Sequence, residues 1–242
     1  MSESASSIGI LGGTGDEGRG IAARLALQGV PVLIGSRSRQ RAREVAREIA
    51  QQVAGHLPSS RRNPASSAES GHEAGAVSGH ENGELPDRCD TLFLTVPFDH
   101  AEDLVAQLAP SWQDRHLLID VTVPLYFDKG PRLRRLSTPS GSEALRQVLP
   151  EKVRMAAALK TVPAHLLCEV DKPLDCDEFL CADSQKARAG ALQVLERIPG
   201  IRWIDAGPLR YCQALEAMTM LVIGLNVRHK SREGRFKVQG IA

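Results

Sequence analysis

The sequence has 242 residues, of which 42% are hydrophobic and 24% charged, and its 30 basic residues nearly balance its 29 acidic ones. This composition predicts one large or two modest globular domains, and the small net charge disfavours a nucleic-acid or membrane-surface partner. No apolar run reaches the ~18 residues of a membrane span, the N-terminus lacks a signal-peptide pattern, and five cysteines form no CxxC pair, which together predict a cytoplasmic protein without a metal site.

The first elements alternate between two kinds of hydrophobic pattern. A short apolar run over residues 8–11 ends in glycines, and a helical pattern then continues as far as Gly29. A second apolar run over 31–35 precedes a charged helix predicted over 38–54. A strand, a helix, a strand and a helix in this order predict the βαβα unit of an α/β fold.

The stretch from 55 to 88 is polar, rich in glycine, serine and proline, and free of aromatic residues. These features predict a polar loop insertion that is mostly mobile, with one short edge strand near 76–78. Three histidines lie here, His56, His72 and His80, at spacings that match no metal motif. We expect them to be solvated surface residues.

Regular structure is predicted again from residue 91 onward. Two strands over 91–96 and 117–123, each followed by a proline, are apolar enough to be buried on both faces of a parallel sheet. The remaining expected elements, in chain order, are a helix over 99–108, a helix near 142–148, a strand over 153–159, a helix over 183–197, a strand over 201–204 and a helix over 211–227. The last helix has few polar breaks, which predicts burial in the core or in a subunit interface.

A glycine-rich turn joins the first strand to the first helix. Gly13, Gly15 and Gly18 fit G-x-G-x-x-G, which is typical of dinucleotide-binding βαβ units when it stands between a strand and a helix. In such units the first glycine permits the tight turn, the second the approach of a pyrophosphate, and the third the close packing of helix on strand. We therefore predict dinucleotide binding; a purely structural glycine turn is the alternative.

The end of the second strand indicates which dinucleotide is bound. An NAD-binding protein usually carries Asp or Glu there, whereas this chain reads Gly35-Ser36-Arg37-Ser38-Arg39-Gln40-Arg41. Guanidinium groups match a phosphate in geometry and charge, so Ser36, Arg37 and Arg41 are predicted to bind the 2′-phosphate of NADP. The remaining arginines of this helix, Arg39, Arg43 and Arg47, are expected to form a solvated face.

Three later segments extend the pattern over most of the chain. The glycine turn and Gly35-Ser36-Arg37 are followed by residues 95–101 (TVPFDHA), 160–164 (KTVPA) and 205–209 (DAGPL). In order and approximate spacing, these segments resemble the F420-dependent NADP reductase family. The resemblance implies a Rossmann-like doubly wound parallel sheet, with an NADP-binding domain over 1–163 and a smaller C-terminal α/β part over 164–242. It also implies hydride exchange between NADP(H) and the deazaflavin coenzyme F420, and a homodimer.

The resemblance also implies positions for the cofactor. Thr14, Gly15, Asp16 and Glu17 would line the phosphate turn, and Val96, Ile119 and Ala164 would lie along the nicotinamide end. Pro97, which ends its strand at the carboxyl edge of the sheet, is included in the predicted cofactor site, because open α/β sheets bind ligands at that edge. Lys160 stands where other members carry His or Asn.

Hydride transfer between two carriers requires orientation and a dry pocket, so no catalytic acid, base or nucleophile is predicted. Lys160 is a candidate contact to the hydride acceptor, and a solvent-facing lysine is the alternative. His100, His165 and Cys168 lie near these segments and are expected to be packing groups. An NADPH-dependent reductase of another small acceptor (a quinone, flavin, imine or metal chelate) and a non-catalytic NADP(H) sensor remain open as alternative functions.

Overall fold

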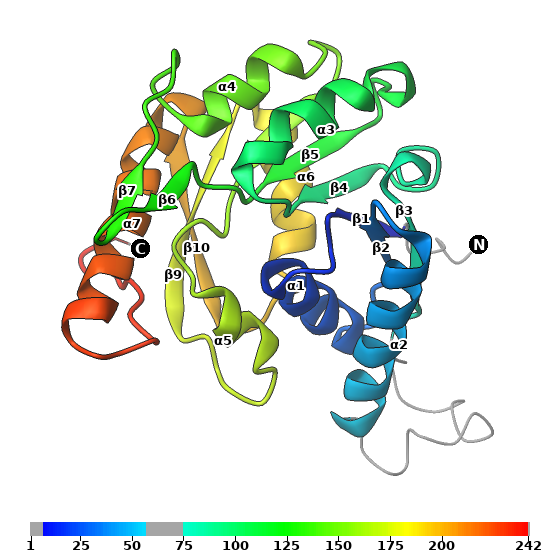
Figure 1. Ribbon diagram of the computed structural model, residues 1–242, viewed down its shortest axis with the longest axis horizontal. Coiled ribbons are helices and arrows are strands. Elements are labelled where there is room, and N and C mark those ends of the chain that lie inside the picture. Colours follow the sequence, from blue (N-terminus) through cyan, green and yellow to red (C-terminus); the bar gives the residue numbers. More distant parts are fainter. Residues whose placement is uncertain (1–6, 57–74, 242) are drawn as a thin grey trace.

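A computed structural model describes residues 7–56 and 75–241 of the protein (Figure 1). Its strands are β1 (Ile8–Leu11), β2 (Val32–Ser36), β3 (Val77–Glu81), β4 (Thr91–Leu94), β5 (Leu117–Asp120), β6 (Leu125–Phe127), β7 (Pro131–Leu133), β8 (Arg154–Ala157), β9 (Cys176–Ala182) and β10 (Ile201–Gly207). Its α-helices are α1 (Asp16–Leu27), α2 (Arg39–His56), α3 (Ala101–Gln107), α4 (Gly141–Val148), α5 (Ala164–Cys168), α6 (Gln185–Leu195) and α7 (Cys212–Arg228).

Eight of these strands form one sheet in the order β10-β9-β8-β5-β4-β1-β2-β3. Neighbouring strands are parallel except β8 and β9. The chain leaves β1 toward β2 and β3 on one side and later returns to place β4 on the other side. The predicted Rossmann-like doubly wound sheet is therefore confirmed, and the switch between β1 and β4 opens the crevice where such sheets bind ligands.

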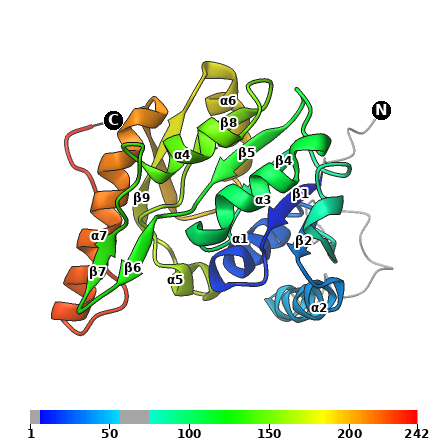
Figure 2. The same ribbon diagram turned by 45° about the horizontal axis from the view of Figure 1, so that its top comes forward.

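Helices cover both faces of the sheet in three layers, as the two views show (Figures 1 and 2). Helices α1, α2, α5 and α6 pack into one apolar core, and α3, α4 and α7 pack into the other. The side chains of successive strand residues point to opposite faces of the sheet. Phe93 lies in the first core, whereas Leu92 and Leu94 lie in the second. This double burial explains why strands such as β4 read as continuous apolar runs.

The C-terminal part of the chain extends the same sheet. Strands β9 and β10 lie beyond the boundary expected at residues 163 and 164, yet they continue the sheet that the N-terminal strands begin. The sequence did not predict β9, although all seven of its residues are buried, because Asp177 and Glu178 interrupt its apolar pattern. The β6–β7 hairpin was also not predicted; it lies beside α7 in both views (Figures 1 and 2).

The polar stretch is more ordered than predicted where the structure describes it. Helix α2 continues to His56, and residues 75–88 contain β3 and a 3-10 helix, Asn82–Glu84, with Leu85 fully buried. The edge strand predicted near 76–78 is confirmed as β3, which pairs with β2 at the edge of the sheet. The loop predicted after it is wrong for Asn82–Glu84, which form the 3-10 helix. Residues 57–74, with His72, lie outside the described residues.

The two described histidines of this stretch have carboxylate neighbours. His56 Nε2 lies 2.8 Å from Asp171 Oδ1, and His80 Nδ1 lies 3.3 Å from Glu84 Oε2.

Among the described helices, none has the length and apolar character needed to cross a membrane.

Candidate cofactor site

The turn after β1 depends on glycine at three places. Gly12 has a positive φ of 74°, and a Cβ there would lie 2.3 Å from a side-chain carbon of Val96. The backbone N–H of Gly12 donates to Asn82 Oδ1 at 3.0 Å. The tight turn that was predicted to depend on Gly13 therefore depends on the left-handed backbone of Gly12, while a Cβ on Gly13 would lie 3.0 Å from Ile10.

Two further glycines, Gly15 and Gly18, lie at the start of α1. A Cβ on Gly18 would lie 2.5 Å from the Cα of Gly13, so only glycine permits this close packing of helix on turn. Gly15 caps α1 without a side-chain hydrogen bond, and a Cβ there would meet no atom within 4 Å. The first N–H groups and the positive end of the helix dipole therefore face open space, which suits a phosphate.

A first cavity, of about 520 Å³, opens beside this turn. The residues that line it come from the ends of β1, β2 and β4 and from α3: Gly12, Thr14, Gly15, Ser36, Arg37, Arg41, Asn82, Thr95, Val96, Pro97, His100, Asp103, Leu104 and Gln107. We call it the basic cavity, because the guanidinium groups of the exposed Arg37 and Arg41 line it.

The arginines of this region differ in their partners. Arg37 forms no ion pair with any residue in the described part of the chain, and Arg41 lies 3.5 Å from Glu44 one helical turn away. Arg39 instead pairs with Glu84 and lies 3.6 Å from Glu81. Arg39 therefore has carboxylate partners of its own, whereas Arg37 has a free guanidinium at the basic cavity.

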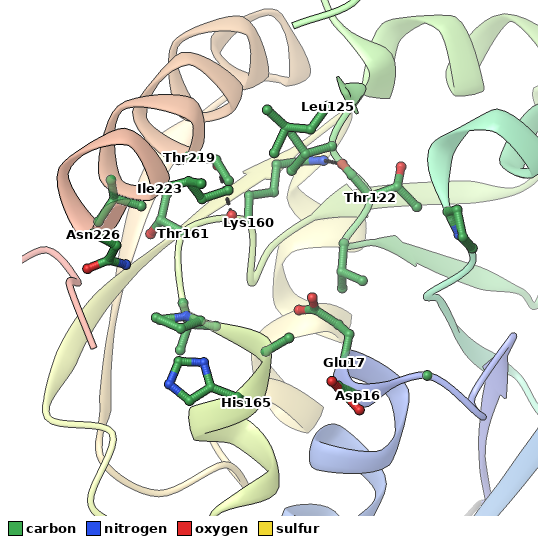
Figure 3. A pocket seen from close by; sticks show the side chains of 18 of the residues that line it. Asp16, Glu17, Thr122, Leu125, Lys160, Thr161, His165, Thr219, Ile223 and Asn226 are labelled. Carbon is green, nitrogen blue, oxygen red and sulfur yellow. Dashed lines mark hydrogen bonds between the residues drawn. The ribbon is translucent and has the colours of Figure 1, made fainter. Parts of the chain in front are cut away.

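A second cavity, of about 790 Å³, adjoins the first and shares with it Gly15, Thr95, Val96 and Pro97. It lies between the carboxyl ends of β4, β5 and β8 on one side and α5, α7 and the β6–β7 hairpin on the other. Its walls are mainly apolar, with Val121, Val162, Val222 and Ile223 among them, and we call it the apolar cavity. Figure 3 shows residues from α1, α5 and α7 around it.

Lys160 lies in the wall of the apolar cavity and is only 3% exposed. Its ammonium donates to Asp120 Oδ2 at 2.9 Å. It also donates to the carbonyl oxygen of Thr122 (Figure 3). Burial alone would lower the pKa of Lys160, but the carboxylates of Asp120 and Glu216 raise it above its ordinary value, so the lysine stays charged. The alternative of a solvent-facing lysine is therefore wrong. This ion-pair partner could not be predicted from the sequence, because Asp120 is 40 residues away.

Both carboxylate oxygens of Asp120 accept hydrogen bonds from other residues as well. Its Oδ1 accepts from the backbone N–H and the hydroxyl of Thr122 at 2.8 and 2.7 Å, and its Oδ2 accepts from Ser142 at 2.6 Å. Close by, the Glu216 carboxylate accepts from the N–H of Gly141 at 3.0 Å at the start of α4. A buried ion pair with this many hydrogen bonds fixes the ends of β5 and β8 relative to α4 and α7.

Two further carboxyl groups lie near Lys160. Glu178, on β9, is buried and accepts from the hydroxyl of Thr161 at 2.6 Å, and burial raises its pKa to about 7. Glu17, in the first turn of α1, is half-buried as a residue, but its Oε1 is shielded from solvent and has no hydrogen-bond partner in the described structure. Burial, with a smaller contribution from Glu178, raises the pKa of Glu17 to about 8.

The predicted site residues are distributed over the two cavities. Thr14, Ser36, Arg37 and Arg41 line the basic cavity, Gly15, Val96 and Pro97 line both, and Asp16, Glu17, Lys160 and Ala164 line the apolar cavity. Gly13 and Gly18 form the turn without lining a cavity, and Ile119 lies in the core. Val121 and Thr122, just beyond β5, line the apolar cavity where Ile119 was expected.

Sequence reasoning missed several residues around these cavities. His100 and His165, expected to be packing groups, line the basic and the apolar cavity respectively, while the Cys168 thiol donates to the Asp16 carbonyl at 3.0 Å. Asn82 was hidden in the polar stretch that was predicted as a loop. Asn226, on α7, reaches the apolar cavity from the other end of the chain (Figure 3).

Comparison with known proteins agrees with this geometry. Residues 7–124 match the family described as NADP oxidoreductase, coenzyme F420-dependent. The F420-dependent NADP reductase of Methanocaldococcus jannaschii is 31% identical over 93% of this chain and 94% of its own length. That of Methanothermobacter thermautotrophicus is 30% identical over 97% of this chain and 95% of its own length.

A solved structure shows the same fold at greater distance. The crystal structure of a protein from Arthrobacter sp. FB24 superposes with a TM-score of 0.75 at 21% identity, covering 97% of this chain and all of that one. The likeness to the two archaeal enzymes extends over 93% and 97% of this chain. The protein therefore belongs to the F420-dependent NADP reductase family.

Proposed function

We propose that this protein is an oxidoreductase that transfers a hydride between NADP(H) and coenzyme F420. The observation that carries the proposal is the pair of adjoining cavities, one basic and one apolar, which share Gly15, Thr95, Val96 and Pro97. Two carriers that exchange a hydride must meet at one place, and cavities that share a wall provide it. The names of the archaeal relatives support the choice of the two carriers.

The residues present fit NADP(H) in the basic cavity. The uncapped first turn of α1 offers N–H groups to a diphosphate, and Gly15 leaves the approach open. Arg37, which has no ion-pair partner among residues 7–56 and 75–241, would bind the 2′-phosphate together with Ser36 and Arg41. Val96 and Pro97, shared between the cavities, together with Ala164, would hold the nicotinamide end.

The apolar cavity fits a flat heterocycle such as the deazaflavin. Its volume of about 790 Å³ lies within the usual range for cofactor pockets, and its valines and Ile223 exclude water from the bound ring. When bound, F420 supplies a carbon that accepts or releases the hydride. The protein holds both reactants in register, so we propose that residues 1–163 bind NADP(H) and that residues 164–242 close the acceptor side through α5 and α7.

The test is to mix purified protein with NADPH and F420 and to follow the loss of deazaflavin absorbance, with NADH as the control. Bleaching with NADPH and little with NADH is the expected result. Tight NADPH binding without bleaching would reject F420 as the acceptor, and other acceptors would then be assayed. Binding with no turnover of any acceptor would identify a sensor.

We further propose a homodimer in the cytoplasm. Leu221, Leu225 and Val227 on α7 are exposed, and Val227 is 66% accessible. Apolar side chains gathered on one helix favour a subunit contact. Light scattering should give twice the chain mass, and Leu225→Glu should give the monomer. All five cysteines are free thiols, which is consistent with a reducing compartment.

A further inference from the structure

Reduction of F420 by NADPH consumes a proton as well as a hydride. The hydride leaves the dihydronicotinamide with its bonding electron pair and forms a C–H bond on the deazaflavin. The electron pair displaced within the deazaflavin ring ends on a ring nitrogen, which then takes a proton. If the apolar walls shield the bound ring from bulk water, a side chain at the cavity must supply this proton.

Glu17 is placed to hold such a proton. Its side chain points into the apolar cavity from the start of α1, as Figure 3 shows. Its Oε1 is buried and has no hydrogen-bond donor within the described part of the protein. A buried carboxylate oxygen without a donor is costly, whereas a protonated carboxyl group is neutral and can donate to a bound ligand.

The neighbouring charges agree with a protonated Glu17. Glu178, on β9, raises its pKa further, and Lys160 opposes this effect only in part because Asp120 already neutralises the lysine. His165 and Cys168 face the start of α1 from α5, and Asp16 precedes Glu17 on the same helix. A neutral Glu17 also avoids placing a second carboxylate, beside that of Asp16, next to a bound diphosphate.

The other groups of the cavity are less suitable donors. The Lys160 ammonium is already bound to Asp120 and Thr122. Glu178 does not line the cavity and is bound to Thr161. Asp16 is exposed to solvent. His165 lines the cavity and is the one rival that the described residues offer at this wall.

We propose that Glu17 is the catalytic acid that protonates the deazaflavin as the hydride arrives, and the base that takes this proton back in the reverse reaction. The proposal rests on the proposed function. In the forward step the O–H bond of Glu17 breaks, its electron pair stays on the carboxylate, and the proton forms the N–H bond of reduced F420. Water entering after product release restores the proton.

The first test needs no cofactor. Infrared spectra of the ligand-free protein should show the carbonyl band of a protonated carboxyl group that disappears as the pH is raised through about 8. Glu17→Gln should remove this band, and Glu178→Gln should remove a different one with a midpoint near 7. A band near pH 8 that persists in Glu17→Gln would overturn the proposal.

The second test is kinetic. For F420 reduction by NADPH, kcat of the wild type should fall above about pH 8, whereas Glu17→Gln should lower kcat about 100-fold and flatten the profile, with NADPH affinity retained. Glu17→Asp should restore part of kcat together with a pH-dependent profile. In Asp16→Asn, the matched change one residue earlier, the shape of the wild-type profile should remain.

The outcomes separate this role from the proposed function. A wild-type protein that does not reduce F420 would overturn the proposed function and this role with it. A wild type that reduces F420, with Glu17→Gln retaining its kcat and pH profile, would overturn the role of Glu17 alone. The same holds if His165→Gln, instead of Glu17→Gln, abolishes the pH dependence.

Discussion

Replacing Arg37 with alanine should separate NADPH from NADH. Arg37 lines the basic cavity and has no ion-pair partner among the described residues, so its guanidinium is available to a ligand phosphate. A hydrogen bond to a charged group contributes about 1.5–3 kcal/mol, which corresponds to a loss of roughly 10- to 150-fold in affinity. NADH lacks the 2′-phosphate and should bind the variant about as well as it binds the wild type.

The assay is a calorimetric or fluorescence titration of each nucleotide at low and at high salt. Because Arg37 is exposed, the difference between the two nucleotides should shrink as the ionic strength rises. Arg39→Ala is the matched control: its guanidinium pairs with Glu84, so NADPH affinity should change by less than about twofold. Equal losses of NADPH and NADH affinity in Arg37→Ala would refute the assignment of the 2′-phosphate site.

Three further predictions concern stability. Lys160→Met should lower the free energy of unfolding by about 3–5 kcal/mol in urea titrations, because it leaves the buried Asp120 carboxylate unpaired; the double variant with Asp120→Asn should recover part of this loss. Arg24→Met should cost more than about 2 kcal/mol, because the buried guanidinium donates to the carbonyls of four residues around α5; a loss below 1 kcal/mol would contradict this structural role. Folding raises the pKa of Glu17 from 4.5 to about 8, so its full contribution to the free energy of unfolding is present below about pH 4.5. As the pH rises from there to about 8, the free energy of unfolding should fall by up to about 5 kcal/mol. Thermal unfolding of Glu17→Gln should lack that fraction of the pH dependence.

The sequence by itself was enough to predict the first strands of the sheet and the glycine turn between β1 and α1. Strands buried on both faces read as continuous apolar runs, so β1, β2, β4 and β5 were found close to their observed bounds. The glycine turn was recognisable because its chemistry is local: a tight turn and a close helix contact require glycine at fixed spacing. The absence of a carboxylate beside Arg37 was equally local and gave the prediction of NADP.

Only the tertiary structure shows which residues far apart in the chain come into contact. Strand β9 was hidden because Asp177 interrupts its apolar pattern; folding satisfies that carboxylate with Arg202 on β10, at 2.6 Å. The Lys160–Asp120 pair likewise joins the ends of two strands that meet only in the sheet. The raised pKa of Glu17 is the clearest case, because a pKa depends on which atoms exclude water from the group. That exclusion depends on contacts that exist only in the folded chain, such as the packing of α5 against α1.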